Sequence, residues 1–346
     1  MRTPALTSPS ARLRVPAPPL PRRRRRVLAV AAAAALLAGC GAVRLDTPPP
    51  RPASPDAAEV TRQDEAVRAA TIEQTVSEVT ADGAVAAVLE RVGAHAEAHT
   101  EVLGGVWSPW PEGAPKDVAT PDVATAAPTA EPTAADVLAL LTAGAAAARE
   151  AALTAGDDAA AAAMLAVSLS RSADAADLAA ATGAEAPASS AAPLTPQALL
   201  ERGADGPTVL VLDSARFALE TVAARSDGTA RAHAADRAAY LQGLVDAALA
   251  AGAPDTREGA YDLGVGEPGR DAAGAGQGTD GEAADPALTT QQAIAVAAED
   301  RLLRHWTFSL GLVGPDEREA LIAAAEDAAA QVRDWGGRLP ALPGVG

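Results

Sequence analysis

Two histidines one helical turn apart, His95 and His99, have the residue type and spacing that metal binding requires. At positions i and i+4 of a helix both rings project from one face, where they can jointly ligate Zn²⁺ or Cu²⁺. Two ligands make a weak site, and the sequence does not identify a third ligand on another helix. The alternative is a pair of histidines packed at a helix end near Trp107. His95 and His99 are therefore a hypothetical metal site.

Three carboxylates in the second half of the chain share helix faces with apolar residues. Asp213 and Glu220 lie on either side of a phenylalanine at helical spacing, and Glu299 is followed by leucines on the same stripe. They are candidates for vestigial metal-ligand positions. A buried carboxylate needs a hydrogen-bonding partner. The alternative is therefore that these groups are half-exposed or paired with an arginine such as Arg301 or Arg304.

The motifs of well-known catalytic sites are missing from the sequence. A di-iron site in a four-helix bundle uses Glu-x-x-His, but other residues stand three positions before the four histidines: Val92, Ala96, Ala230 and Leu302. The His-Glu-x-x-His motif of zinc peptidases also fails, because Ala96 replaces the glutamate. There is no Gly-x-Ser-x-Gly and no glycine-rich phosphate loop with a lysine. The sequence predicts a non-enzymatic protein without a catalytic cofactor.

The N-terminal 40 residues have the layout of an export signal. Arg22–Arg26 precede the apolar run Val27–Ala38, which is too short to span a bilayer. The residues Leu37-Ala38-Gly39-Cys40 resemble a lipobox, in which a thiol accepts diacylglycerol and small residues fit the signal peptidase. We expect residues 1–39 to be a lipoprotein signal peptide and Cys40 to carry diacylglycerol, with palmitate among its acyl chains. Cys40 is the only cysteine, so the exported chain must be stable without an internal disulfide.

Charge and composition indicate where in the cell the rest of the chain lies and which partners it disfavours. The proline-rich residues 40–56 are expected to be a tether that holds the folded part away from the membrane. Beyond the leader, 20 basic and 45 acidic residues give a net charge of −25, which disfavours nucleic acid as a partner. We expect a protein on the extracytoplasmic face of the cell membrane, where an envelope protein is a possible partner.

Helical periodicity dominates from residue 57 onward, and half of the residues are apolar although only 2% are aromatic. This favours an all-α fold with two tandem units, each arranged as hairpin, long crossover and hairpin. The expected units are 57–183 and 205–343, joined by a linker at 184–204; one merged helical domain is the alternative. A bundle with one long crossover has ferritin-like connectivity. The expected helices are 56–80, 84–103, 133–154, 158–182, 208–226, 229–251, 290–310 and 316–335.

Several helix-face motifs in the second half resemble one family. Residues 205–343 are similar to the ferritin-like domain of unknown function found in lipoproteins of high-GC Gram-positive bacteria. The first half, with His95–His99 leading into Trp107, is similar to the N-terminal part of longer members. This resemblance implies antiparallel four-helix bundles but supplies no activity. The motifs that carry it are Leu212–Arg225, Ala260–Leu263, Ala298–Arg301, Trp306, Trp335 and Pro340.

The expected role is therefore a non-catalytic binding or interaction module of unknown ligand. The loop that carries Trp107 and Trp110 between prolines is a plausible contact surface, because exposed aromatic side chains suit recognition. Capping of the bundle end by the same residues is the alternative. A metal-binding lipoprotein that uses His95 and His99 is the second hypothesis. A transporter's solute-binding subunit would need strands alternating with helices, which the pattern does not show.

Overall fold

The computed structural model describes residues 55–110, 116, 124–128, 130–189, 191–263 and 288–345, and these residues contain helices but no strands. The all-α prediction is confirmed for this part of the chain. Cys40, the signal peptide and all but the last two residues of the tether lie outside it. The helices are α2 (Ala57–Glu78), α3 (Gly83–Val102), α4 (Ala134–Thr154), α5 (Asp158–Thr182), α6 (Pro196–Arg202), α7 (Gly206–Arg225), α8 (Gly228–Ala250), α9 (Thr290–Leu310) and α10 (Arg318–Asp334), with a 3₁₀ turn η2 (Pro315–Glu317).

The helix ends follow local sequence signals. Thr133 and Asp136 form a capping box at the start of α4, and α5 ends at Gly183 in the left-handed conformation, with φ of 70°. Asp56 caps α2 through the backbone N–H of Glu59. The short helix α6 was not predicted, because it lies within a region that reads as a Pro/Ala/Ser linker.

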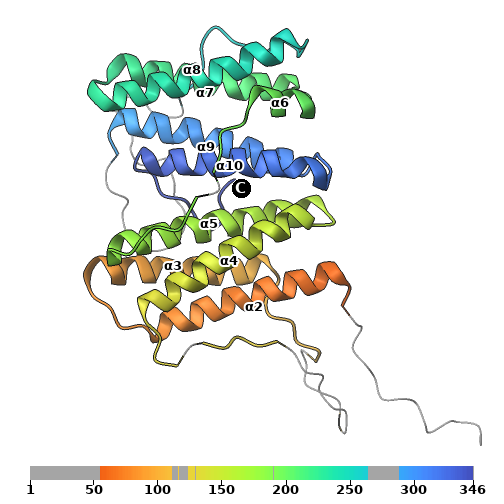
Figure 1. Cartoon of the computed structure of the whole chain (residues 1–346), viewed down its shortest axis with the longest axis vertical. Coiled ribbons are helices and arrows are strands. Elements are labelled where there is room, and N and C mark those ends of the chain that lie inside the picture. Colours follow the sequence, from red (N-terminus) through yellow and green to blue (C-terminus); the bar gives the residue numbers. More distant parts are fainter. Residues whose placement is uncertain are drawn as a thin grey trace, which may run out of the picture. The chain divides into compact units, whose positions relative to one another are not determined.

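Helical hairpins pack into one compact unit that contains all of these helices. In the first half α2 packs on α3 and α4, and α5 packs on α3 and α4. In the second half α7 packs on α8 and α9, and α9 packs on α10. The halves also touch each other, because α5 contacts α9 and α10 contacts α4 and α5. Figure 1 shows the α9/α10 hairpin between the α4/α5 hairpin and the α7/α8 hairpin.

Small side chains fill much of the interior. One apolar cluster runs from α4 and α5 into α7–α10, and a smaller cluster joins α2–α5. Each buried alanine removes less apolar surface from water than a leucine would, so the core depends on close helix contact and on interspersed leucines such as Leu165, Leu212 and Leu241. Within this tightly packed interior, a few charged side chains are buried and must find partners there.

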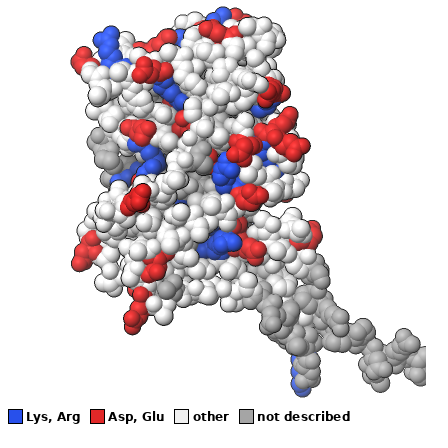
Figure 2. Space-filling model, viewed as in Figure 1, with Lys and Arg blue, Asp and Glu red and all other residues white. Residues whose placement is uncertain are grey.

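Among the described residues, α4 is the one helix long and apolar enough to cross a membrane by length and composition. It packs against α2, α5 and α10 inside the compact unit, and the core helix of a soluble protein passes the same test. The visible surface carries acidic and basic side chains interspersed with uncharged ones (Figure 2).

Candidate functional site

A buried ion pair lies between α2, α4 and α5 in the first half. The Arg171 side chain is fully buried, and its Nη1 donates to Glu65 Oε2 at 2.5 Å and to the carbonyl of Gly144 at 3.0 Å. The other oxygen of Glu65, Oε1, forms an ion pair with Arg68 Nε at 3.0 Å. The two arginines bind both oxygens of Glu65, so this carboxylate is engaged by guanidinium groups.

His95, on α3, belongs to a second polar group, which lies one turn beyond Arg171 along α5. Its Nδ1 lies 2.8 Å from Asp174 Oδ2 and 3.3 Å from Ser170 Oγ, and Arg91 Nε donates to the other oxygen of Asp174 at 3.2 Å. A hydrolytic triad needs the serine and the carboxylate on opposite ring nitrogens. Here both contact Nδ1, and Ser170 is buried, so the trio is a hydrogen-bonded packing contact. His95 Nε2 is buried and has no partner within the described residues.

His99 is held by the C-terminal segment. Its Nε2 lies 2.8 Å from the carbonyl oxygen of Ala341, so this nitrogen carries the proton and donates it. Burial, together with the nearby Arg171 guanidinium, lowers the pKa of His99 to about 3. The His99 and His95 rings are 6.5 Å apart and tilted by 45°. In the described ranges no group of three His, Cys, Asp or Glu residues is placed to hold a metal ion.

The second half contains a three-residue charge network. Arg237 on α8 donates through Nε and Nη2 to both oxygens of Glu299 on α9, at 2.9 and 2.8 Å. Its Nη1 donates to Asp327 on α10 at 2.6 Å. Glu299 is fully buried, and burial raises its pKa although Arg237 opposes the shift. The network thus connects three helices at the centre of the second half.

Glu299 is paired with an arginine, as the sequence suggested, but the arginine is a different residue from the two that were named. Arg301 and Arg304 were the arginines suggested from sequence, but Arg301 hydrogen-bonds to Ser214 and Arg304 pairs with Asp300. They point away because they lie two and five positions from Glu299 on the same helix. The true partner, Arg237, comes from the neighbouring hairpin.

Asp213 and Glu220 do not converge on Glu299. Asp213 is buried and accepts from Arg216 Nε at 2.8 Å and from the Tyr261 hydroxyl at 2.6 Å. Glu220 is 54% exposed and pairs with the other end of the same Arg216, at 2.7 Å. Both carboxylates therefore neutralise an arginine of their own helix, and Asp213 also fixes the segment that follows α8.

The tryptophans of the proposed contact loop are both half-buried. Trp110 Nε1 is buried and has no hydrogen-bond partner among the described residues. The loop therefore offers less aromatic surface than its sequence suggests.

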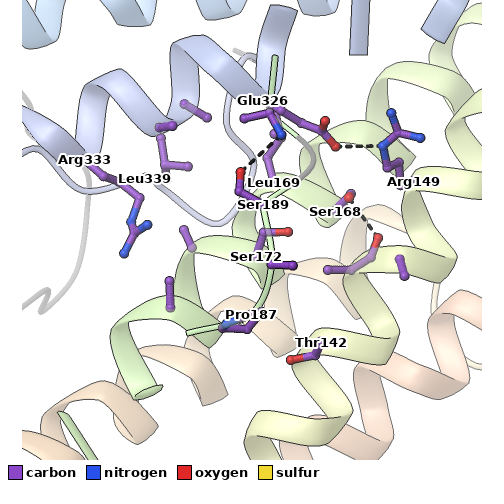
Figure 3. Close-up of a pocket in the computed structure, with 18 of the residues that line it drawn as sticks. Thr142, Arg149, Ser168, Leu169, Ser172, Pro187, Ser189, Glu326, Arg333 and Leu339 are labelled. Carbon is purple, nitrogen blue, oxygen red and sulfur yellow. Dashed lines mark hydrogen bonds and ion pairs between the residues drawn. The ribbon is translucent and has the colours of Figure 1, made fainter. Parts of the chain in front are cut away.

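A cavity of about 770 Å³ opens between the two halves of the chain. Its walls come from α4, α5, α10, residues 186–189 and 191, and Leu339 beyond α10 (Figure 3). Alanines, Leu169 and Leu339 supply most of the apolar lining, and the charged lining consists of two arginines and three glutamates: Arg149, Arg333, Glu150, Glu319 and Glu326. Volumes of this size accommodate small organic ligands. This cavity could not be predicted from the sequence, because its residues come from segments far apart in the chain.

No protein-family model, curated protein or solved structure matches this chain.

Proposed function

We propose that this chain is a lipid-anchored cell-envelope protein whose ferritin-like helical scaffold is a non-catalytic, ligand-binding module. The cavity between α4, α5 and α10 is the observation that carries the proposal. The all-helical hairpin packing and the long segment that joins α3 to α4 support the ferritin-like part. The lipobox at Cys40 supports the anchored part.

The buried charge networks support a structural role for the bundle interior. Where a di-iron bundle would gather carboxylates around a metal, the buried Glu65 and Glu299 are bound by Arg171 and Arg237. A guanidinium supplies the positive charge that a buried carboxylate requires. These carboxylates are thus already neutralised by the protein's own side chains, and the cavity is left as the place for a ligand.

A solvatochromic dye tests the binding role. Nile red should brighten when it enters the cavity of the wild-type protein and should not do so in Ala146→Trp, because an indole placed on this cavity-lining position occupies the space. Ala143→Trp is the matched control, since Ala143 is also exposed on α4 but does not line the cavity. Equal dye binding by the two variants would contradict the proposal.

Replacing Cys40 tests the anchor. Because Cys40 is the only thiol available for lipidation, Cys40→Ala should move the protein from the membrane fraction to the soluble extracytoplasmic fraction. The helical content measured by circular dichroism should not change, since Cys40 precedes α2, the first described helix, by 17 residues. Val43→Ala, just beyond the lipobox, should stay with the membrane. A Cys40→Ala protein that remains in the membrane would show that the apolar leader is an uncleaved anchor.

Metal binding at His95 and His99 is a second candidate function. The observation that favours it is the buried, unpartnered Nε2 of His95, since a neutral imidazole nitrogen is a metal ligand. Against it, His99 Nε2 already donates to Ala341, so joint ligation through both Nε2 atoms requires this hydrogen bond to break.

A further inference from the structure

Resting on the proposed function, we propose that the cavity binds a small amphipathic ammonium compound, whose cationic group hydrogen-bonds to Glu326 and whose apolar part lies against the alanine walls. The cavity is separate from the buried ion pairs of the bundle, because its lining does not include Arg171 or Arg237 and has charged residues of its own.

One carboxylate oxygen of the cavity lining lacks a hydrogen-bond donor among the described residues. Glu326 projects from α10, and its Oε1 accepts from Arg149 Nε at 2.8 Å (Figure 3). Its Oε2 is buried and has no partner within the described part of the chain. A buried oxygen without a donor destabilises the protein until something donates to it. Glu326 lines the cavity although Oε2 itself is shielded from it, so a ligand there would supply the missing N–H once the carboxylate turns toward the cavity.

The local charge favours a cation over a neutral donor. Arg149 is shared by two carboxylates, because its Nη2 also donates to Glu319 Oε1 at 2.7 Å. Hydrogen bonding to Glu319 raises the pKa of Arg149, so this arginine stays charged. Arg333 is already paired with Asp177 at 2.6 Å. At the Glu326 end two glutamates thus face one arginine, which leaves an excess negative charge that an ammonium group would neutralise.

The remaining residues of the lining determine whether the rest of the ligand is polar or apolar. On the walls of α4, α5 and α10 the recurring residue is alanine, and Leu169 and Leu339 add larger apolar surface. Ser168 already donates to the carbonyl of Ala145, at 2.9 Å, so its proton is not available to a ligand. An apolar chain buried there is removed from water, while a polyamine would place further charged groups against these alanine walls. The occupant is therefore a single ammonium group on an apolar body.

Competition against Nile red distinguishes recognition of the ammonium group from simple occupation of the cavity by an apolar chain. The probes are n-octylammonium, n-octanol and octanoate, which share a chain and differ in charge. Wild-type protein should bind octylammonium about tenfold more tightly than octanol, as expected for one charge-assisted hydrogen bond, and octanoate most weakly. Glu326→Gln should abolish this preference while octanol binding stays unchanged. Glu90→Gln removes an exposed carboxylate of α3 away from the cavity and should keep the preference.

Each result has a distinct meaning. Equal displacement by octylammonium and octanol, or a preference that survives in Glu326→Gln, overturns the ammonium assignment while dye binding still supports the proposed binding module. Dye that neither enters the wild-type cavity nor is displaced overturns both. Circular dichroism of Glu326→Gln confirms that the variant is folded; should it unfold, Glu326→Asp, which keeps the charge but withdraws it from the cavity, must weaken the preference or the assignment falls.

Discussion

Replacing Arg237 by methionine should lower the free energy of unfolding by about 3–5 kcal/mol, the usual cost of removing one member of a buried ion pair. Methionine keeps most of the volume but leaves Glu299, which is fully buried, without either of its two hydrogen bonds. Asp327 also loses its partner. Urea denaturation followed by circular dichroism measures the loss.

Two further variants test whether the loss comes from the unpaired charge. The double variant Arg237→Met/Glu299→Leu removes both charges and should regain most of the lost stability, because an apolar pair can replace a buried ion pair. Arg304→Met removes an arginine that pairs with Asp300 on the surface of α9, and should cost less than about 1 kcal/mol. An Arg237→Met protein as stable as the Arg304→Met protein would contradict a structural role for the network.

The loss in Arg237→Met should also depend on pH. Burial already raises the pKa of Glu299, and removing Arg237 raises it further, because the ionised form loses its cation. The ionised carboxylate is what destabilises the variant. The deficit should therefore be complete above the raised pKa of Glu299 and shrink as the pH falls below it.

Acid should destabilise the wild-type protein, and His99→Gln should remove much of this sensitivity. The pKa of His99 is lowered to about 3 by burial, whereas an unfolded histidine titrates near 6.5. The unfolded chain then binds a proton that the folded protein does not, so stability is complete above about pH 6.5 and is lost as the pH falls toward 3. The full shift corresponds to about 5 kcal/mol, since one pKa unit is about 1.4 kcal/mol. A glutamine amide can still donate to Ala341.

The half-buried His305 provides a graded comparison. Burial, aided by Arg202, lowers the pKa of His305 to about 4, so His305→Gln should flatten the pH dependence less than His99→Gln does. Unfolding free energies measured from pH 7 to pH 4 give the pH dependence of stability. NMR titration of the ring protons gives the pKa of each histidine. If the wild-type and His99→Gln proteins lose stability equally over this range, His99 is not held neutral by the fold.

The helices could be predicted from sequence because their signals are local. Apolar spacing and the residues that cap or end each helix, such as Thr133 and Gly183, depend only on neighbours a few positions away. Helix α6 was missed because seven residues next to prolines and serines show too little periodicity. The predicted ends of α7 differed by one or two residues from the ends in the structure.

The charge networks could be predicted only in part, because each one joins different helices. A sequence signal did exist: Arg171 interrupts the apolar face of α5 and Arg237 interrupts that of α8, and buried arginines require carboxylates. Which carboxylate pairs with each arginine depends on how the hairpins pack, so Arg237 was not identified as the partner of Glu299. The cavity was harder still, since its wall combines α4, α5, α10 and a linker segment.

The most direct test of the account is native mass spectrometry combined with elemental analysis, on protein purified without a histidine tag from the cells that naturally make it. We predict a non-covalently bound small ammonium compound that is absent from Glu326→Gln and Ala146→Trp, and transition metal far below one ion per chain. One equivalent of zinc, copper or iron that is lost in His95→Ala, together with no bound organic molecule, would contradict the account and establish the histidine pair as the functional site.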